Sequence, residues 1–218
     1  MLTKQALEYL RLGTGGSYSL ARDAITHRIW DTRLIAATIS DYTYFSQPVG
    51  SAWRQAGTFK TLTETNIYDT GKLPNGQTFL VNRIGICCLI PLTAAVITTE
   101  SLTRAFNNLL CSSVFEIRLA GREYDFQAHG RHFLPMPLFN VGVSTANSLR
   151  IGDMIAAGWL KLDPTPIFLD QLVTFSVIQR LANPDTNVTT ILNADATLLN
   201  AAYGTIMVVL EGFLTRAK

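Results

Sequence analysis

Charged side chains are scarce in this sequence of 218 residues. They make up 16% of the chain, against about 25% in ordinary soluble domains, whereas hydrophobic residues make up 48%. A monomer of this composition would expose an unusually uncharged surface, and permanent interfaces between subunits are apolar in the same way. The composition therefore favours an oligomer, with a large, well-buried monomer as the alternative.

Cysteine is also rare, and its three positions, Cys87, Cys88 and Cys111, lack the spacing of a disulfide framework or a zinc site. We interpret them as reduced, buried thiols of a protein made in a cytoplasm. Cys87 and Cys88 are adjacent, and neighbouring side chains of a strand point to opposite faces of the sheet. Their thiols are therefore expected to diverge.

No hydrophobic run has the length of a membrane-spanning helix. The most apolar uncharged run, Ile84–Thr99, contains Pro91 and is shorter than the roughly 20 residues that a span requires. Near the start, Lys4, Gln5 and Glu8 interrupt the apolar residues before a signal-peptide core can form. We therefore expect neither a spanning helix nor secretion through a signal peptide.

Positive charge is not concentrated in any segment. The formal net charge is +2, and the basic residues are spread along the chain. Neutralising the phosphates of a nucleic acid takes many cations placed close together. Bulk nucleic-acid binding is therefore not indicated, and no sequence-specific nucleic-acid partner is predicted.

From Tyr42 onward, short β-branched and aromatic runs alternate with Pro, Gly and Asn, which is typical of a β-sandwich or barrel. Eight or nine strands are expected, enough for one all-β sandwich of two sheets. The stronger candidates are Thr58–Thr63, Thr78–Leu89, Ser113–Ala120, Glu123–Gln127, Gly158–Leu162, Leu172–Arg180 and Tyr203–Leu214, and the weaker ones are Thr65–Tyr68 and Leu149–Ile155.

Two turn signals organise these strands. Pro74-Asn75-Gly76 allows the chain to reverse between Ile67-Tyr68 and the run that begins at Phe79. Gly121-Arg122 separates two alternating runs, so a hairpin is predicted over Ser113–Gln127. A long loop is expected over Asn183–Asn200, where Asn, Asp and Thr are frequent.

The first 41 residues are predicted to form an arm, followed by one domain over 42–218. A short helix with Leu2, Leu7 and Leu10 on one side ends at the glycine cluster 13–16. Ala21–Ile39 fits a helix or a strand equally well. A second, inserted helix is expected over Thr98–Cys111, because its apolar residues form a stripe behind a threonine cap.

Candidate catalytic and metal-binding residues do not form complete sets. The last histidine, His132, precedes Ser144, whereas hydrolases with a nucleophile elbow place the histidine after the serine. His129 and His132 lack the further ligands that zinc requires. The glycine cluster 13–16 lacks the lysine of a phosphate-binding loop. We therefore predict a protein that is not an enzyme, with no catalytic, metal or cofactor-binding residues.

A stretch covering roughly Tyr42–Leu119 resembles the major capsid proteins of tailless icosahedral bacteriophages in the types of its residues and in the order of its segments. The run 208–213 is similar to the closing strand of such chains. The matching segments are Phe45-Ser46-Gln47-Pro48-Val49-Gly50, Lys60-Thr61-Leu62, Thr65-Asn66, Gly71-Lys72-Leu73-Pro74, Gln77-Thr78-Phe79 and Val208-Val209-Leu210-Glu211-Gly212-Phe213.

The resemblance implies a jelly-roll subunit of an icosahedral capsid shell, made in the host cytoplasm and located in the virion. Such subunits stand as trimers or pseudo-hexameric capsomers, with other virion proteins and often an internal membrane as partners. Double jelly-roll capsid proteins are longer than 218 residues. A single roll is therefore favoured, with a compact double roll as the alternative.

Seven apolar and aromatic residues are predicted to make contacts between subunits. The four aromatic ones also suggest an alternative function, a carbohydrate-binding jelly-roll module such as a phage spike or lectin-like domain, although packing in the core would explain them too. The seven residues are Leu2, Leu7, Leu10, Tyr42, Tyr44, Phe45 and Trp53.

Overall fold

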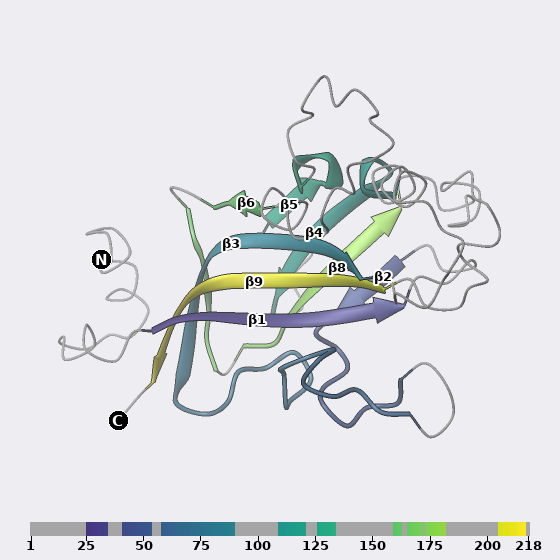
Figure 1. The fold of residues 1–218 in the computed structure, drawn as a ribbon. Coiled ribbons are helices and arrows are strands. Elements are labelled where there is room, and N and C mark those ends of the chain that lie inside the picture. Colours follow the sequence, from purple (N-terminus) through teal and green to yellow (C-terminus); the bar gives the residue numbers. More distant parts are fainter. Residues whose placement is uncertain are drawn as a thin grey trace, which may run out of the picture.

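The computed structural model describes nine strands that form two antiparallel sheets facing one another (Figure 1). These residues include very little helix, so the all-β prediction is confirmed. The described residues are 25–34, 41–53, 58–89, 109–120, 126–133, 159–162, 165–171, 173–181 and 205–216.

The first sheet has the strand order β1-β9-β3-β6, and β7 also pairs with β3. The second sheet has the order β2-β8-β4-β5. The elements are β1 (Ile25–Leu34), β2 (Asp41–Tyr44), β3 (Gln77–Leu89), β4 (Ser113–Leu119), β5 (Phe126–His129), the 3-10 helix η2 (Gly130–Phe133), β6 (Trp159–Lys161), β7 (Ile167–Leu169), β8 (Phe175–Leu181) and β9 (Thr205–Arg216).

The strands pair in a nested order: β4 and β5 form the innermost pair, and each further nested pair joins a strand that precedes β4 to a strand that follows β5. Outside that innermost pair, β3 pairs with β6 and β7, β2 with β8, and β1 with β9. β6 and β7 pair with successive segments of β3, so together they act as one interrupted strand. Because β1 and β3 lie in one sheet and β2 and β4 in the other, the nested pairs are distributed over both sheets.

Side chains that alternate along the strands fill the space between the sheets. In β8, Phe175, Val177 and Leu181 are buried in the core, as are Val208 and Leu210 of β9. Burying each apolar side chain of this size contributes roughly 1.5–3 kcal/mol. Because the core draws residues from both sheets, each sheet covers the apolar face of the other.

One line of hydrogen bonds runs along the inner face of the second sheet. Tyr44 Oη donates to Gln179 Oε1 at 2.7 Å, and Gln179 Nε2 donates to Ser113 Oγ at 2.9 Å. Ser113 Oγ in turn donates to the carbonyl of Leu109 at 2.6 Å. The three polar side chains are buried and bond to one another, so they tie β2, β8 and β4 together without the penalty of unpaired polar groups.

The described part of the connection between β2 and β3, residues 45–53 and 58–76, covers the free edge of β1. Asn66 Oδ1 accepts from the backbone N–H of Trp30, and Asn66 Nδ2 donates to the carbonyl of Arg28, both at 2.8 Å. Farther along the edge, Lys60 Nζ donates to the carbonyl of Thr32 at 2.7 Å. These bonds occupy backbone groups that an uncovered edge strand would offer to another chain.

A buried ion pair holds this β2–β3 loop in place. Lys60 Nζ lies 2.5 Å from Asp31 Oδ1, and neither side chain is accessible to solvent. Asp31 Oδ2 accepts from the backbone N–H of Phe45 at 2.6 Å, and Lys60 Nζ lies 4.8 Å from the ring centroid of Trp53. Burial lowers the pKa of Lys60, and the negative charge of Asp31 opposes that effect.

Most of the predicted strands are confirmed. The predictions over Thr78–Leu89, Ser113–Ala120, Gly158–Leu162, Leu172–Arg180 and Tyr203–Leu214 overlap β3, β4, β6, β8 and β9. The predicted hairpin is confirmed by the pairing of β4 with β5, although β5 begins and ends a few residues later than expected.

Other strand predictions are wrong or incomplete. Thr58–Thr63 and Thr65–Tyr68 form turns and isolated bridges, because their backbone and side-chain groups bond across the loop and to β1. The short strands β2 and β7 were not predicted. The candidate strand Leu149–Ile155 and the loop Asn183–Asn200 lie outside the described residues.

Part of the predicted arm belongs to the sheet. Within residues 1–41, residues 25–34 form β1, which pairs with β9 along its whole length. The segment Ala21–Ile39, which fitted a helix or a strand equally well from its sequence, therefore contains a strand. The short N-terminal helix lies outside the described residues, as does most of the inserted helix, of which the structure describes a helical turn at residues 109–111.

The turn predicted at Pro74-Asn75-Gly76 is present. The backbone N–H of Gln77 donates to the carbonyl of Pro74 at 3.1 Å, and Gly76 has a φ of 76°, which glycine adopts without strain. The turn leads from the loop into β3 and does not join two paired strands, since Ile67 and Tyr68 lie outside the strands.

Breaking the buried ion pair should destabilise the fold. Lys60→Met leaves the Asp31 carboxylate buried without its counter-ion, so the free energy of unfolding should fall by about 3–5 kcal/mol. Adding Asp31→Asn removes that charge and keeps an oxygen for the Phe45 N–H, so the double variant should be more stable than Lys60→Met alone. Urea unfolding curves measure all three proteins.

The matched control is Arg28→Gln, which breaks an ion pair to Glu211 in which the arginine side chain is 61% exposed. Its loss of stability should stay within about 1 kcal/mol, because water screens an exposed pair. If Lys60→Met were no more destabilising than this control, or if the double variant were no more stable than Lys60→Met alone, the buried pair would not hold the loop.

Candidate functional site

The structure places the four predicted aromatic contact residues in the core. Tyr42, Tyr44, Phe45 and Trp53 are all buried, and the ring of Phe45 packs against Phe175 with 5.3 Å between centroids. Their side chains therefore stabilise the subunit and are not available to a partner or a sugar. The prediction that these four aromatic residues make contacts between subunits is therefore wrong. The carbohydrate-binding alternative also loses the residues on which it was based.

The remaining three predicted contact residues, Leu2, Leu7 and Leu10, lie outside the described residues. His129 and His132 are both exposed, and His129 Nδ1 accepts from the backbone N–H of Arg131 at 3.1 Å. Within the described ranges, no three His, Cys, Asp or Glu residues are grouped as metal ligands. The helices in those ranges are too short or too polar to cross a membrane.

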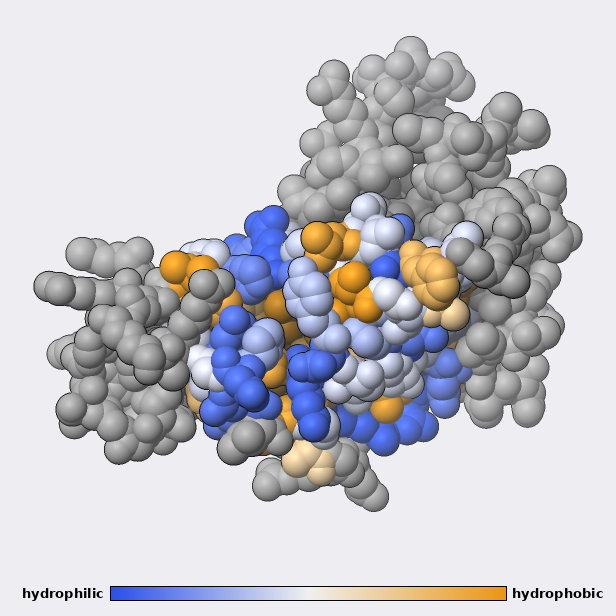
Figure 2. Space-filling model, turned by 90° about the horizontal axis from the view of Figure 1, so that it is seen from below, coloured by the Kyte–Doolittle hydropathy of each residue, from blue (hydrophilic) through white to orange (hydrophobic). Residues whose placement is uncertain are grey.

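Exposed apolar side chains occur on the β2–β3 loop. Phe59, Leu62 and Tyr68 are each more than half exposed, and Ile25, at the start of β1, is 47% exposed. Figure 2 views the molecule from below and shows apolar residues distributed among hydrophilic ones on that face. We refer to Phe59, Leu62 and Tyr68 as the loop apolar group.

The outer face of the first sheet carries two rows of residues in register. Residues opposite one another on paired strands point to the same side of a sheet. The charged row crosses four strands and consists of Arg28, Glu211, Arg83 and Lys161. The aromatic row lies beside it and consists of Trp30, Val209, Gly85 and Trp159.

Ion pairs organise the centre of the charged row. Arg28 Nε lies 2.6 Å from Glu211 Oε2, and an Arg83 guanidinium nitrogen lies 3.4 Å from Glu211 Oε1. One carboxylate is therefore shared by two guanidinium groups. Lys161, next to Arg83 in register, is exposed.

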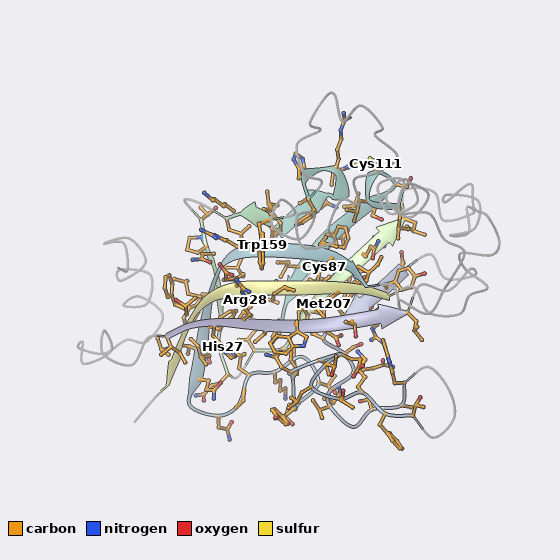
Figure 3. All side chains as sticks on the ribbon, in the orientation of Figure 1. His27, Arg28, Cys87, Cys111, Trp159 and Met207 are labelled. Atoms are coloured by element: carbon orange, nitrogen blue, oxygen red, sulfur yellow. The ribbon has the colours of Figure 1, made fainter. Side chains whose placement is uncertain are left out.

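Trp159 lies flat over Gly85, which has no side chain to displace it. A Cβ atom at position 85 would lie 2.9 Å from Trp159 Cε3, closer than real Cβ contacts come. The guanidinium carbon of Arg28 lies 5.5 Å from the centroid of the Trp159 ring. Figure 3 shows Arg28 and Trp159 approaching each other across β9 and β3.

The outer face of the second sheet holds a separate charge cluster. Glu116 Oε2 accepts from Arg118 at 2.9 Å and from Arg180 at 3.2 Å, and Gln127 donates to Glu116 Oε1 at 3.2 Å. Burial acts to raise the pKa of Glu116, but the hydrogen bonds and charges of the two arginines outweigh it and lower this pKa. The carboxylate therefore stays ionised and links neighbouring strands.

The two described thiols differ in their surroundings. Burial raises the pKa of Cys87 to about 11, whereas Cys111 is exposed, which corrects the prediction that all three thiols are buried. Neither forms a disulfide. A thiol with such a raised pKa is a poor nucleophile near neutral pH, so Cys87 does not supply a reactive group to the outer face of the first sheet.

Comparison with family models, curated proteins and solved structures finds no match for this chain. Its function is therefore inferred from its own residues. Sequence patterns did not reveal the charged and aromatic rows, because their members come from four strands far apart in the chain. The only local sequence features that could have pointed to these rows are the isolated tryptophans and Gly85, which interrupts the apolar run of β3.

The thiols should react with iodoacetamide at very different rates. Near pH 8, about one in a thousand Cys87 side chains is ionised for a pKa of about 11, so Cys111 should be alkylated first. The Cys87 rate should rise about tenfold per pH unit until the pH approaches that value.

Mass spectrometry with peptide fragmentation measures each site separately, including the neighbouring Cys88. Protein unfolded in urea serves as the control, because both thiols should then react at similar rates. Equal labelling of Cys87 and Cys111 in the folded protein would contradict the raised pKa of Cys87.

Proposed function

We propose that this protein is a jelly-roll subunit that assembles into an icosahedral capsid shell, as the major capsid protein of a tailless bacteriophage. It acts without catalysis, through contacts between copies of itself. The observation that carries the proposal is the nested strand pairing, because it distributes the strands over two antiparallel sheets as a jelly roll does.

The strand order supports the jelly roll directly. A jelly roll consists of eight strands in two four-stranded sheets, connected as Greek keys. The orders β1-β9-β3-β6 and β2-β8-β4-β5 have this form when β6 and β7 are counted as one interrupted strand. These strands account for one roll, so we propose a single roll.

Jelly rolls also occur in lectins and cupins, so a second feature is needed to favour a shell. The low share of charged residues, 16%, fits a protein whose surface is largely covered by neighbours. The loop apolar group supplies exposed side chains for such contacts, on a loop whose position is set by the Asp31–Lys60 ion pair. Buried aromatics, in contrast, offer no stacking surface to a sugar.

Assembly would depend on many modest contacts. A shell repeats one interface around symmetry axes, so closure and multivalency stabilise the whole even where each contact is weak. The proposed partners are copies of this chain in trimers or pseudo-hexameric capsomers, together with other virion proteins. The location is the virion, after synthesis in the host cytoplasm.

The loop apolar group should be required for assembly. The expressed protein should form a discrete trimer, hexamer or particle, and the triple variant Phe59→Ser, Leu62→Ser, Tyr68→Ser should shift it toward the monomer. The reason is that the variant lacks the exposed apolar area that only a neighbour would bury. Light scattering coupled to size-exclusion chromatography measures the mass at several concentrations.

Ile25→Ser is the matched control, since it removes exposed apolar area at the start of β1 instead of on the loop. It should leave the assembled mass unchanged, and urea unfolding should show that all variants are folded. A wild-type monomer at high concentration would count against the shell, and a triple variant that assembles normally would exclude this loop as the contact.

A further inference from the structure

The charged row itself carries an excess of positive charge, with three cations and one carboxylate among its four residues. Arg28 and Arg83 share Glu211, and Lys161 lies next to Arg83 in register. The side chains of Arg28 and Arg83 are 61% and 45% exposed, and Lys161 is exposed as well. A cation-rich line therefore faces solvent across the sheet, with guanidinium and ammonium donors free to approach an anion.

The aromatic row forms a flat surface directly beside these cations. Val209 lies in register between Trp30 and Gly85 and is 8% exposed. Trp30 and Trp159 are partly exposed at the two ends of the row. Gly85 lets the Trp159 ring lie close to the backbone of β3.

We propose that this outer face of the first sheet binds single-stranded nucleic acid without sequence preference. Proteins with that activity combine a positively charged track for the phosphates with aromatic side chains on which bases stack. The phosphates lie along Arg83 and Lys161, and a base stacks on the outer side of the Arg28 guanidinium plane, whose inner side lies over the Trp159 ring.

The pairing of the two rows favours nucleic acid over other anionic partners. An acidic peptide would use the cations but has no need of a flat aromatic surface, and a neutral sugar would use the tryptophans but not the cations. The site was not expected from the spread of basic residues along the sequence. Pairing of β1, β9, β3 and β6 is what brings these cations together.

Binding at this face does not depend on shell assembly, because all of its residues lie in one subunit. Binding of a labelled oligothymidine of about 20 nucleotides to the full-length protein can be followed by fluorescence anisotropy, with quenching of tryptophan fluorescence reporting stacking. Light scattering on the same samples records the assembly state, so failure to assemble and failure to bind are distinguished.

The wild-type protein should bind, and its affinity should fall steeply between about 50 and 200 mM salt. The double variant Arg83→Gln, Lys161→Gln should weaken binding about tenfold and reduce the salt slope by about 0.7 for each phosphate that the protein no longer neutralises. Trp159→Leu should weaken binding about tenfold and remove most of the quenching, with the salt slope unchanged.

Arg180→Gln is the matched control for the cations, because its side chain is 44% exposed but lies on the second sheet. It should bind like the wild-type protein, and urea unfolding should show that every variant is folded. The proposal would be overturned by no binding at low salt, or by Arg180→Gln weakening binding as much as the double variant Arg83→Gln, Lys161→Gln. It would also be overturned by polyglutamate competing as well as the oligonucleotide, or by Trp159→Leu binding normally.

Discussion

The buried contact between Asp31 and Lys60 determines how the longest described loop sits on the sandwich. Its two charges are fully removed from water, which costs free energy unless each finds partners. Asp31 meets that requirement with the backbone N–H of Phe45, and Lys60 with the carbonyl of Thr32. The pair therefore joins the edge of β1, the end of β2 and the loop, and so positions the loop apolar group.

In both sheets, the inner face and the outer face differ in the residues that they carry. Inner faces bury the core and the Tyr44–Gln179–Ser113 hydrogen bonds, which set the register of the second sheet. Outer faces keep their polar groups, in the rows of the first sheet and in the cluster around Glu116. In the shell that we propose, the loop would contact neighbouring subunits and the outer face of the first sheet would be left for a different partner.

The sequence predicted the long strands because β3, β4 and β9 are rich in β-branched and aromatic residues. It failed at β2 and β7, which are too short to show alternation, and at Thr58–Thr63, whose threonines favour a strand but bond across the loop instead. Tyr42 and Trp53 stand among polar residues and so looked exposed, although the structure buries them. Long-range pairing alone brings Arg28 and Lys161 to one face.

The central claim is that copies of this chain close into a shell. Negative-stain electron microscopy of the purified protein, or of the material from which it comes, tests that claim most directly, because it shows assembly without any assumption about which residues make the contacts. The account predicts regular particles, or flat arrays of trimeric or pseudo-hexameric capsomers. Isolated single subunits at high protein concentration, with no ordered assembly under any salt condition, would contradict it.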